Sequence, residues 1–186
     1  MRKVVVGIAG MSGAGKATFN EIAKRRGYAM VAMGDVIREE TKRRGLKPTP
    51  ENVGRIMLQI REEEGPAVVA KRCISKIDNA IGNIVLVDGI RSLHEVEEFK
   101  RHFPNFILIA IHSSPETRFQ RLSRRKRSDD PKGWETFLKR DRRELNVGLG
   151  DAIAMADCLI VNEGTKKEFK IKIHDVLEAT LRRWKK

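Results

Sequence analysis

An apolar, β-branched run that leads into a glycine-rich turn constrains the fold of this chain most. Residues 4–8 predict a buried strand, residues 10–15 predict a tight turn, and a helical pattern begins at Lys16. Glycine permits backbone angles and close approaches that a Cβ would forbid. Backbone N–H groups of such a turn point inward and meet the positive end of the helix dipole. This order of elements therefore predicts an anion-binding site.

The spacing Gly10-x4-Gly15-Lys16 matches the phosphate-loop pattern of nucleotide-binding proteins. The flanking strand and helix disfavour a chance glycine-rich turn. Lys16 adds a charge that can reach the β- and γ-phosphates of ATP. Ala17 stands where a hydroxyl usually serves Mg²⁺, and Thr18 follows it, so the loop resembles the adenylate kinase variant. The expected cofactor-binding residues of the loop are Gly10, Met11, Ser12, Gly13, Ala14, Gly15, Lys16, Ala17 and Thr18.

Length and composition favour a single domain over residues 1–186. The chain is 40% apolar and 34% charged, as is ordinary for a globular protein. No apolar run approaches the roughly 20 residues that span a bilayer, so we expect no membrane association. Cys73 and Cys158 are far apart and belong to no CxxC pattern, which argues against a zinc site. These features predict a protein of the reducing cytoplasm.

The net charge of +13 raises the possibility of a nucleic-acid partner. The alternative is an enzyme that handles phosphates and has a solvated basic surface. Residues 121–143 and 166–186 hold much of the basic excess. Aromatic residues make up only 5% of the chain, so a stacking platform for single strands is poorly supplied. A nucleic-acid-associated ATPase or nucleotide switch is therefore the second hypothesis. Nothing in the sequence indicates an oligomeric state.

Strand and helix patterns alternate along the chain, which predicts an α/β fold with a parallel sheet covered on both faces. The expected strands are residues 3–8, 28–33, 83–87, 105–111 and 158–161. Thr49 before Pro50 predicts a helix start, and so do the capping boxes that begin at Ser92 and Thr165. Five short strands with crossover helices resemble a P-loop kinase sheet, and this resemblance implies the strand order 2-3-1-4-5.

Polar residues at the carboxyl ends of the strands are candidates for chemistry, because ligands of such sheets bind there. Asp88 follows four apolar residues, which is the Walker-B arrangement. A carboxylate at this place can hold Mg²⁺ beside the phosphates, and the alternative is an aspartate that caps a loop. We expect Asp88 and Thr18 as the metal residues.

Two arginines follow strands within motifs that resemble those of nucleoside monophosphate kinases. The segment Gly34-Asp35-Val-Ile-Arg38 and the segment Asp88-Gly-Ile-Arg91 each resemble an element whose arginine binds the acceptor phosphate. Two guanidinium groups that converge on one phosphate supply charge and orientation. Taken alone, Arg38 reads as a solvated surface residue. The predicted substrate-binding residues are Asp35, Arg38 and Arg91, with Asp35 as a candidate base.

The basic segment 121–143 resembles the short lid of these kinases. Arg121 and Arg125 match the lid entry, and Arg127 and Arg140 match its exit. Lid arginines neutralise the transferring phosphoryl group and exclude water. The alternative is a solvated basic helix, which we prefer for Arg124, Lys126, Arg142 and Arg143. The predicted catalytic residues are therefore Lys16, Arg91, Arg121, Arg125, Arg127 and Arg140.

The C-terminal part adds a further resemblance. Residues 156–164 read Ala-Asp-Cys-Leu-Ile-Val-Asn-Glu-Gly and look like the ending of dephospho-CoA kinases, where this loop lies beside the adenine of ATP. That resemblance adds Asn162 to the cofactor-binding residues. The whole chain resembles most closely an archaeal family of P-loop proteins related to dephospho-CoA kinase. Membership of that family implies ATP binding and specifies no acceptor.

These motifs together favour an ATP-dependent small-molecule kinase that uses Mg²⁺. The γ-phosphoryl group of ATP would pass to a nucleoside monophosphate or a related acceptor such as dephospho-CoA. Residues 35–80 would form the acceptor-binding cap and residues 121–143 the lid. A nucleotide switch that hydrolyses ATP slowly is a weaker alternative, consistent with Ala17.

Overall fold

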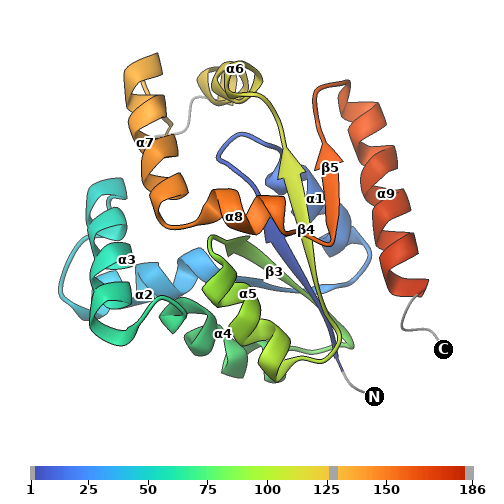
Figure 1. The fold of residues 1–186 in the computed structure, drawn as a ribbon, viewed down its shortest axis with the longest axis horizontal. Helices are drawn as coiled ribbons and strands as arrows, with labels where there is room; N and C mark the ends of the chain where they lie inside the picture. The colour runs from blue at the N-terminus through green and yellow to red at the C-terminus, as the bar shows by residue number, and fades with distance from the viewer. Residues whose placement is uncertain (1–2, 126–129, 183–186) are drawn as a thin grey trace.

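A parallel β-sheet forms the centre of the molecule in the computed structural model, which describes residues 3–125 and 130–182 (Figure 1). The strand order within these residues is β2-β3-β1-β4-β5. Every neighbouring pair is parallel. The predicted fold class and strand order are confirmed. The strands are β1 (Val4–Ala9), β2 (Ala29–Ala32), β3 (Ile84–Ile90), β4 (Phe106–His112) and β5 (Cys158–Val161).

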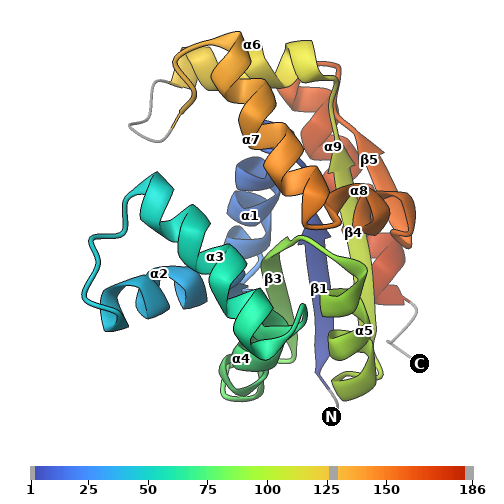
Figure 2. The same ribbon diagram turned by 60° about the vertical axis from the view of Figure 1, so that its left-hand side comes forward.

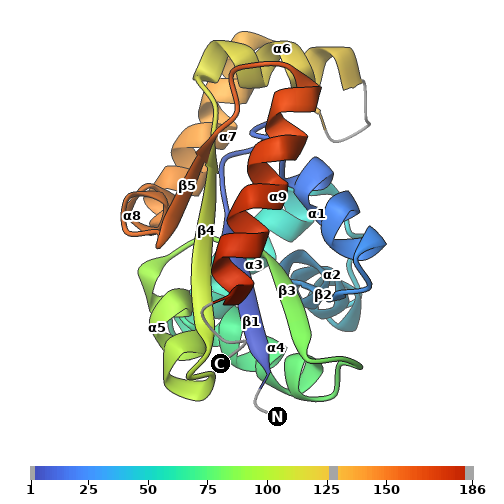
Figure 3. The ribbon, with the colours of Figure 1, turned by 90° about the vertical axis from the view of Figure 1, so that its right-hand side faces the viewer.

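Helices cover both faces of the sheet because successive strand residues point to opposite faces. Val4, Val6 and Ile8 belong to a core shared with α1 (Lys16–Arg25) and α9 (Lys166–Arg182), which lie side by side in Figure 3. Val5 and Ala9 belong to a second core on the opposite face. That core is shared with α2 (Met33–Arg43), α3 (Pro50–Glu64), α4 (Val68–Asp78), α5 (Leu93–His102) and α8 (Leu149–Ala154).

Two further helices, α6 (Pro115–Arg125) and α7 (Trp134–Asn146), lie beyond the carboxyl ends of the strands (Figures 1 and 2). The fold therefore brings α7 near the turn that follows β1. None of the helices within residues 3–125 and 130–182 is long and apolar enough to cross a membrane.

The helix-start signals of the sequence work as predicted. Thr49 accepts a hydrogen bond from the backbone N–H of Asn52 at 3.2 Å, and Pro50 is the first residue of α3. The box at the start of α9 is reciprocal, since Glu168 N–H donates to Thr165 Oγ1 and Thr165 N–H donates to Glu168 Oε2. These bonds satisfy donors that a helix start leaves without partners.

The structure extends the third strand beyond its predicted end. β3 continues past Asp88 to Ile90, with Gly89 at φ +102°. The register with β1 shifts there, because Ile8 pairs with Asp88 and Ala9 with Ile90. One residue is therefore bulged, and glycine tolerates this backbone conformation. The bulge lies directly beside the turn that follows β1.

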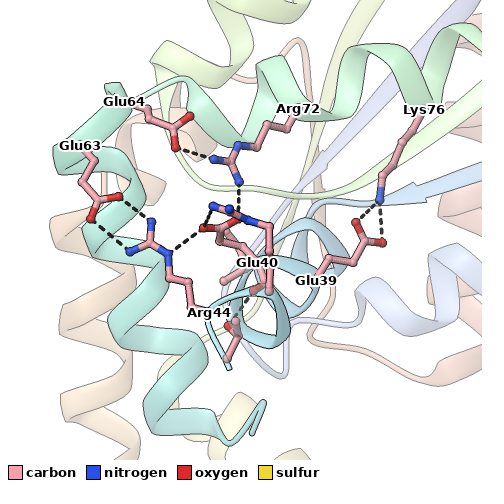
Figure 4. A network of polar contacts seen from close by, with 10 residues as sticks. Glu39, Glu40, Arg44, Glu63, Glu64, Arg72 and Lys76 are labelled. Carbon is pink, nitrogen blue, oxygen red and sulfur yellow. Dashed lines mark hydrogen bonds and ion pairs between the residues drawn. The ribbon is translucent and has the colours of Figure 1, made fainter. Parts of the chain in front are cut away.

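A buried carboxylate ties the helices α2, α3 and α4 together (Figure 4). The Glu40 side chain is 3% exposed and accepts hydrogen bonds from three arginines. Arg43 and Arg44 lie on or just after α2, and Arg72 lies on α4. The guanidinium groups, that of Arg43 foremost, hold the pKa of Glu40 far below its ordinary value.

The same arginines reach acidic residues at the end of α3. Arg44 pairs with Glu63 at 2.5 Å, and Arg72 pairs with Glu64. One acceptor at Glu40 thus positions two cations that also bind α3. The network fixes the three helices that follow β2 relative to one another, and these helices form one wall of the candidate site.

Replacing Glu40 with glutamine should lower the free energy of unfolding by about 1–3 kcal/mol, because three arginines lose the buried, charged acceptor that they share. A carboxylate with a depressed pKa stabilises the fold fully above its unfolded pKa of about 4.3, and this contribution declines as the pH falls toward the folded value. The wild-type advantage over Glu40→Gln should therefore be full at pH 7 and shrink below about pH 4, measured by urea unfolding.

Glu39→Gln is the matched control, since the neighbouring Glu39 side chain is 63% exposed and pairs only with Lys76 among the described residues. Exposed pairs of this kind contribute about 0–1 kcal/mol. Equal unfolding midpoints for the two variants would contradict a stabilising role for the buried carboxylate.

Candidate functional site

The turn between β1 and α1 has the geometry that its glycines predict. Gly10, Gly13 and Gly15 have φ angles of +153°, +84° and +120°. A Cβ on Gly10 would lie 2.6 Å from the carbonyl oxygen of Ile111, and one on Gly13 would lie 2.8 Å from that of Arg118. Larger residues would therefore strain the backbone and collide with neighbouring carbonyls.

Lys16, the first residue of α1, folds back over this turn. Its ammonium group donates to the carbonyl oxygens of Gly10 and Met11. Burial lowers the pKa of Lys16 to about 8, against the opposing effect of Asp88 and with further lowering by nearby arginines. The amine thus lies in a positive environment that an anion would relieve.

Asp88 of β3 lies against α1 and is paired there with Asn20. Asn20 Nδ2 donates to Asp88 Oδ2 at 2.7 Å. The other side-chain oxygen of each residue is buried without a hydrogen-bond partner among the described residues. Sequence reasoning missed Asn20, although it follows Lys16 by four residues and so shares its helix face. Two unpartnered oxygens beside the turn fit a bound cation or its water ligands.

Residues 3–125 and 130–182 contain no cluster of three or more His, Cys, Asp or Glu that would enclose a metal ion. Mg²⁺ in nucleotide sites needs no such cluster, since one or two carboxylates, waters and phosphates suffice. Asp88, with its buried unpartnered Oδ1, fits that role. Thr18 lies in the first turn of α1, where its N–H bonds to Gly15 O, and Ala17 is exposed. Magnesium binding by Asp88 and Thr18 stays a prediction.

Asn162, directly after β5, holds the turn between β1 and α1 in place through hydrogen bonds. Its buried side-chain amide donates to Ala14 O at 2.8 Å. Ser113 Oγ donates to Asn162 O at 2.6 Å, and Arg121 donates to both Ser113 Oγ and Asn162 O. Arg121 thus belongs to the support of the turn, and the adenine contact expected of Asn162 stays a prediction.

The sequence analysis missed Arg118, which is 3% exposed and forms several buried hydrogen bonds in the site. It forms a two-point ion pair with Asp141 of α7, at 2.9 and 2.5 Å. It also donates to the carbonyl oxygens of Ser12 and Ser113, and its guanidinium carbon lies 4.9 Å from the ring centroid of Phe137. Arg118 therefore joins the glycine-rich turn to α7.

A cavity of about 650 Å³ opens among α2, α3, α7 and the end of β3. Figure 2 shows α3 and α7 on either side of this region. Its floor is largely apolar, with Met33, Ile37, Val53, Met57 and Val69. Its acidic residues are Glu51, Asp130 and Glu144. Its basic residues are Arg38, Arg61, Arg91, Lys139, Arg140 and Arg143, so the balance of charge is positive.

The two predicted acceptor arginines both line this cavity, and both are paired. Arg38 binds Asp35 at 2.5 Å, and each side chain is about half exposed. Asp35 does not line the cavity and borders a separate hollow at the β2 edge. Arg91 pairs with Glu144 of α7. Burial lowers the pKa of Arg91 to about 10, which leaves it charged at neutral pH.

The predicted lid arginines separate into two groups. Arg140 lines the cavity and lies near enough to Lys16 and Arg91 to lower the pKa of both. Arg125 is paired with Asp130 and does not line the cavity. Arg127 lies outside the described residues. Arg143, expected on a solvated surface, instead lines the cavity on the same helix as Arg140.

The strand order, the glycine-rich turn after β1 and the aspartate on the neighbouring β3 define a P-loop kinase-like protein. A family model described as an AAA domain matches residues 9–137. The fold is similar to shikimate kinase from Bacteroides thetaiotaomicron, with a TM-score of 0.64 and 15% identity over 95% of this chain and 97% of that one. A gluconokinase from Sinorhizobium meliloti is similar at a TM-score of 0.54 and 15% identity, over 98% and 94%.

The chain belongs to the UPF0200 family. It is 48% identical to the UPF0200 protein MJ1399 of Methanocaldococcus jannaschii, over 96% of this chain and 91% of the relative. It is 44% identical to the UPF0200 protein PH1008 of Pyrococcus horikoshii, over 97% and 100%. The expected membership of an archaeal P-loop family is confirmed. The expected relation to dephospho-CoA kinase stays a prediction.

Arg118→Met should lower the free energy of unfolding by about 3–5 kcal/mol, because it leaves the buried carboxylate of Asp141 without its cation. Removing both charges in Arg118→Met/Asp141→Leu should recover part of that loss. Chemical unfolding of the two variants measures the difference. The exposed Arg124 offers the control, since Arg124→Met should stay within about 0.5 kcal/mol of wild type. A loss in Arg118→Met no larger than in this control would contradict the linking role.

Proposed function

We propose that the protein is an ATP-dependent kinase that transfers the γ-phosphoryl group to a small anionic acceptor, such as a nucleoside monophosphate or dephospho-CoA. One observation carries the proposal. Arg91 and Arg140 line the 650 Å³ cavity and also lie close enough to the Lys16 ammonium to lower its pKa. The phosphate-binding turn and the cavity are therefore neighbours, as donor and acceptor sites must be for direct transfer.

ATP would bind with its phosphates in the turn of residues 10–15. Backbone N–H groups and the N-terminus of α1 favour the negative charge there. Lys16 would exchange its bonds to Gly10 and Met11 for the β- and γ-phosphates. Mg²⁺, held by Asp88 and Thr18, would neutralise part of the phosphate charge.

The acceptor would enter the cavity between α3 and α7. Its attacking oxygen forms a bond to the γ-phosphorus as the bond to the bridging oxygen of ADP breaks. Arg91 and Arg140 would stabilise the charge that spreads over the transferring group. A phosphate acceptor is already ionised, whereas a hydroxyl must lose a proton to a base. Asp35 stays a candidate for that base, although it lies outside the cavity lining.

The similar solved structures support the class of reaction at the level of the fold. Shikimate kinase and gluconokinase transfer a phosphoryl group to a small molecule, as their names state. The alternative is a nucleic-acid-associated ATPase or nucleotide switch. Its support is the net charge of +13 and the exposed lysines at the start of α9. Binding to RNA that weakens steeply with salt would favour that alternative.

The proposed reaction predicts that one small acceptor stimulates ADP release from Mg-ATP and that Lys16→Met reduces turnover by at least 100-fold. The panel contains nucleoside monophosphates, dephospho-CoA and RNA. Lys24→Met is the matched control, because Lys24 lies exposed on the same helix and should leave turnover unchanged. Wild-type turnover in Lys16→Met would rule out the mechanism, and stimulation by RNA alone would favour the ATPase.

The lowered pKa of Lys16 predicts a pH dependence of nucleotide binding. The free protein carries a protonated Lys16 below about pH 8 and loses that proton above it. Bound phosphates stabilise the ammonium, so the affinity for Mg-ATP should fall above pH 8, by up to about tenfold per pH unit. Calorimetric titrations at pH 7, 8 and 9 measure this. Lys24→Met should show the same decline, and a decline of equal size in Lys16→Met would contradict the assignment.

A further inference from the structure

One face of α7 carries the polar residues that line the cavity. These residues are Thr136, Lys139, Arg140, Arg143 and Glu144, whose spacings of three and four residues place them on one side of the helix. Glu144 is paired with Arg91. Arg140 lies near enough to Lys16 to lower its pKa. Arg143 follows Arg140 by nearly one helical turn, about 5 Å along the axis. Lys139 and Arg143 therefore lie on either side of Arg140 along α7, about one turn apart on the same side of the helix.

The basic residues of the cavity differ in whether a carboxylate already neutralises them. Three of them donate to acidic side chains within the protein. An incoming anion would compete with those carboxylates. The pairs are Arg38 with Asp35, Arg61 with Glu95 and Arg91 with Glu144.

Lys139 and Arg143 have no such partner. Within residues 3–125 and 130–182, neither side chain forms a hydrogen bond or an ion pair. The Nε of Arg143 is buried and still lacks an acceptor. Buried polar groups are nearly always partnered, so an unpartnered guanidinium nitrogen in a cavity wall indicates an anion that binds there.

The opposite wall makes room for this guanidinium. Gly54 lies within α3, and a Cβ there would stand 2.9 Å from Arg143 Nη1 and 3.4 Å from its Cζ. Glycine within a helix is less favourable than alanine, so its presence has a cost to α3. The missing side chain lets the Arg143 guanidinium lie against α3.

We propose that Lys139 and Arg143 bind an anionic group of the acceptor, a phosphate or a carboxylate, at the α7 wall of the cavity. The inference rests on the proposed function and narrows it. The acceptor then carries a phosphate or a carboxylate that α7 recognises. Arg91 and Arg140 would stabilise the transferring phosphoryl group, and Lys139 and Arg143 would set the orientation and specificity of the acceptor.

The test uses inorganic phosphate as the probe, with the full chain saturated by Mg²⁺ and β,γ-imido-ATP so that the phosphate-binding turn is occupied. Calorimetric titration of phosphate should show binding to the wild type and an affinity at least tenfold lower in Arg143→Gln. Arg124→Gln is the matched control, because Arg124 is exposed on α6 and lines neither this cavity nor the hollow that Arg142 shares with Lys139 and Arg143. It should bind phosphate as the wild type does.

Gly54→Ala separates a binding role from a structural one. The added methyl group displaces the Arg143 guanidinium and should weaken phosphate binding several-fold. The same change favours the helix, so the melting temperature should not fall. Together, weaker binding and an undiminished melting temperature point to anion recognition and not to damaged packing.

Absence of phosphate binding to the wild type, or equal affinities in wild type and Arg143→Gln, would overturn the inference. These outcomes are distinct from a failure of the proposed function. Binding of β,γ-imido-ATP and acceptor-dependent ADP release are measured separately. Phosphate binding through Arg143 without acceptor-dependent ADP release would support the anion subsite and contradict the kinase proposal.

Discussion

The buried ion pair between Arg118 and Asp141 is the contact on which the arrangement of the site depends. Arg118 also donates to carbonyl oxygens of the phosphate-binding turn and of the loop after β4, so α7 is bound to both. Asp141 follows Arg140 directly on α7 and lies two residues before Arg143. A buried ion pair costs desolvation and is weak evidence for stability by itself. Here it places a helix whose other face lines the cavity.

Concentrated positive charge is the second constraint. Arg91 and Arg140 both lower the pKa of Lys16, and Arg140 also lowers the pKa of Arg91, so these cations repel one another. Nearby carboxylates such as Asp88 and Glu144 offset part of this repulsion. A bound polyphosphate would neutralise the remaining positive charge, so the repulsion among the cations of the free protein favours binding. This electrostatic arrangement is suited to phosphoryl transfer, which needs positioning and charge neutralisation more than covalent chemistry.

The predictable features were local in sequence. The glycine-rich turn and the helix starts at Thr49 and Thr165 follow from the chemistry of neighbouring residues. The strand order follows from the resemblance to a P-loop kinase sheet. The structure contains all of these features. The partners of the arginines were not predictable, since they depend on how α7 packs over the sheet. Arg118 and Arg143 are two basic residues among many in the sequence. Only the fold buries one in an ion pair and leaves the other unpartnered in the cavity wall.

The fate of the γ-phosphoryl group tests the central claim most directly. The protein would be incubated with Mg²⁺, ATP labelled with ¹⁸O in the γ-phosphoryl group and a protein-free pool of small metabolites, and the products analysed by mass spectrometry. The account predicts that the labelled phosphoryl group appears in a small organic phosphate. Label found only in inorganic phosphate, at a rate indifferent to the metabolite pool, would contradict it.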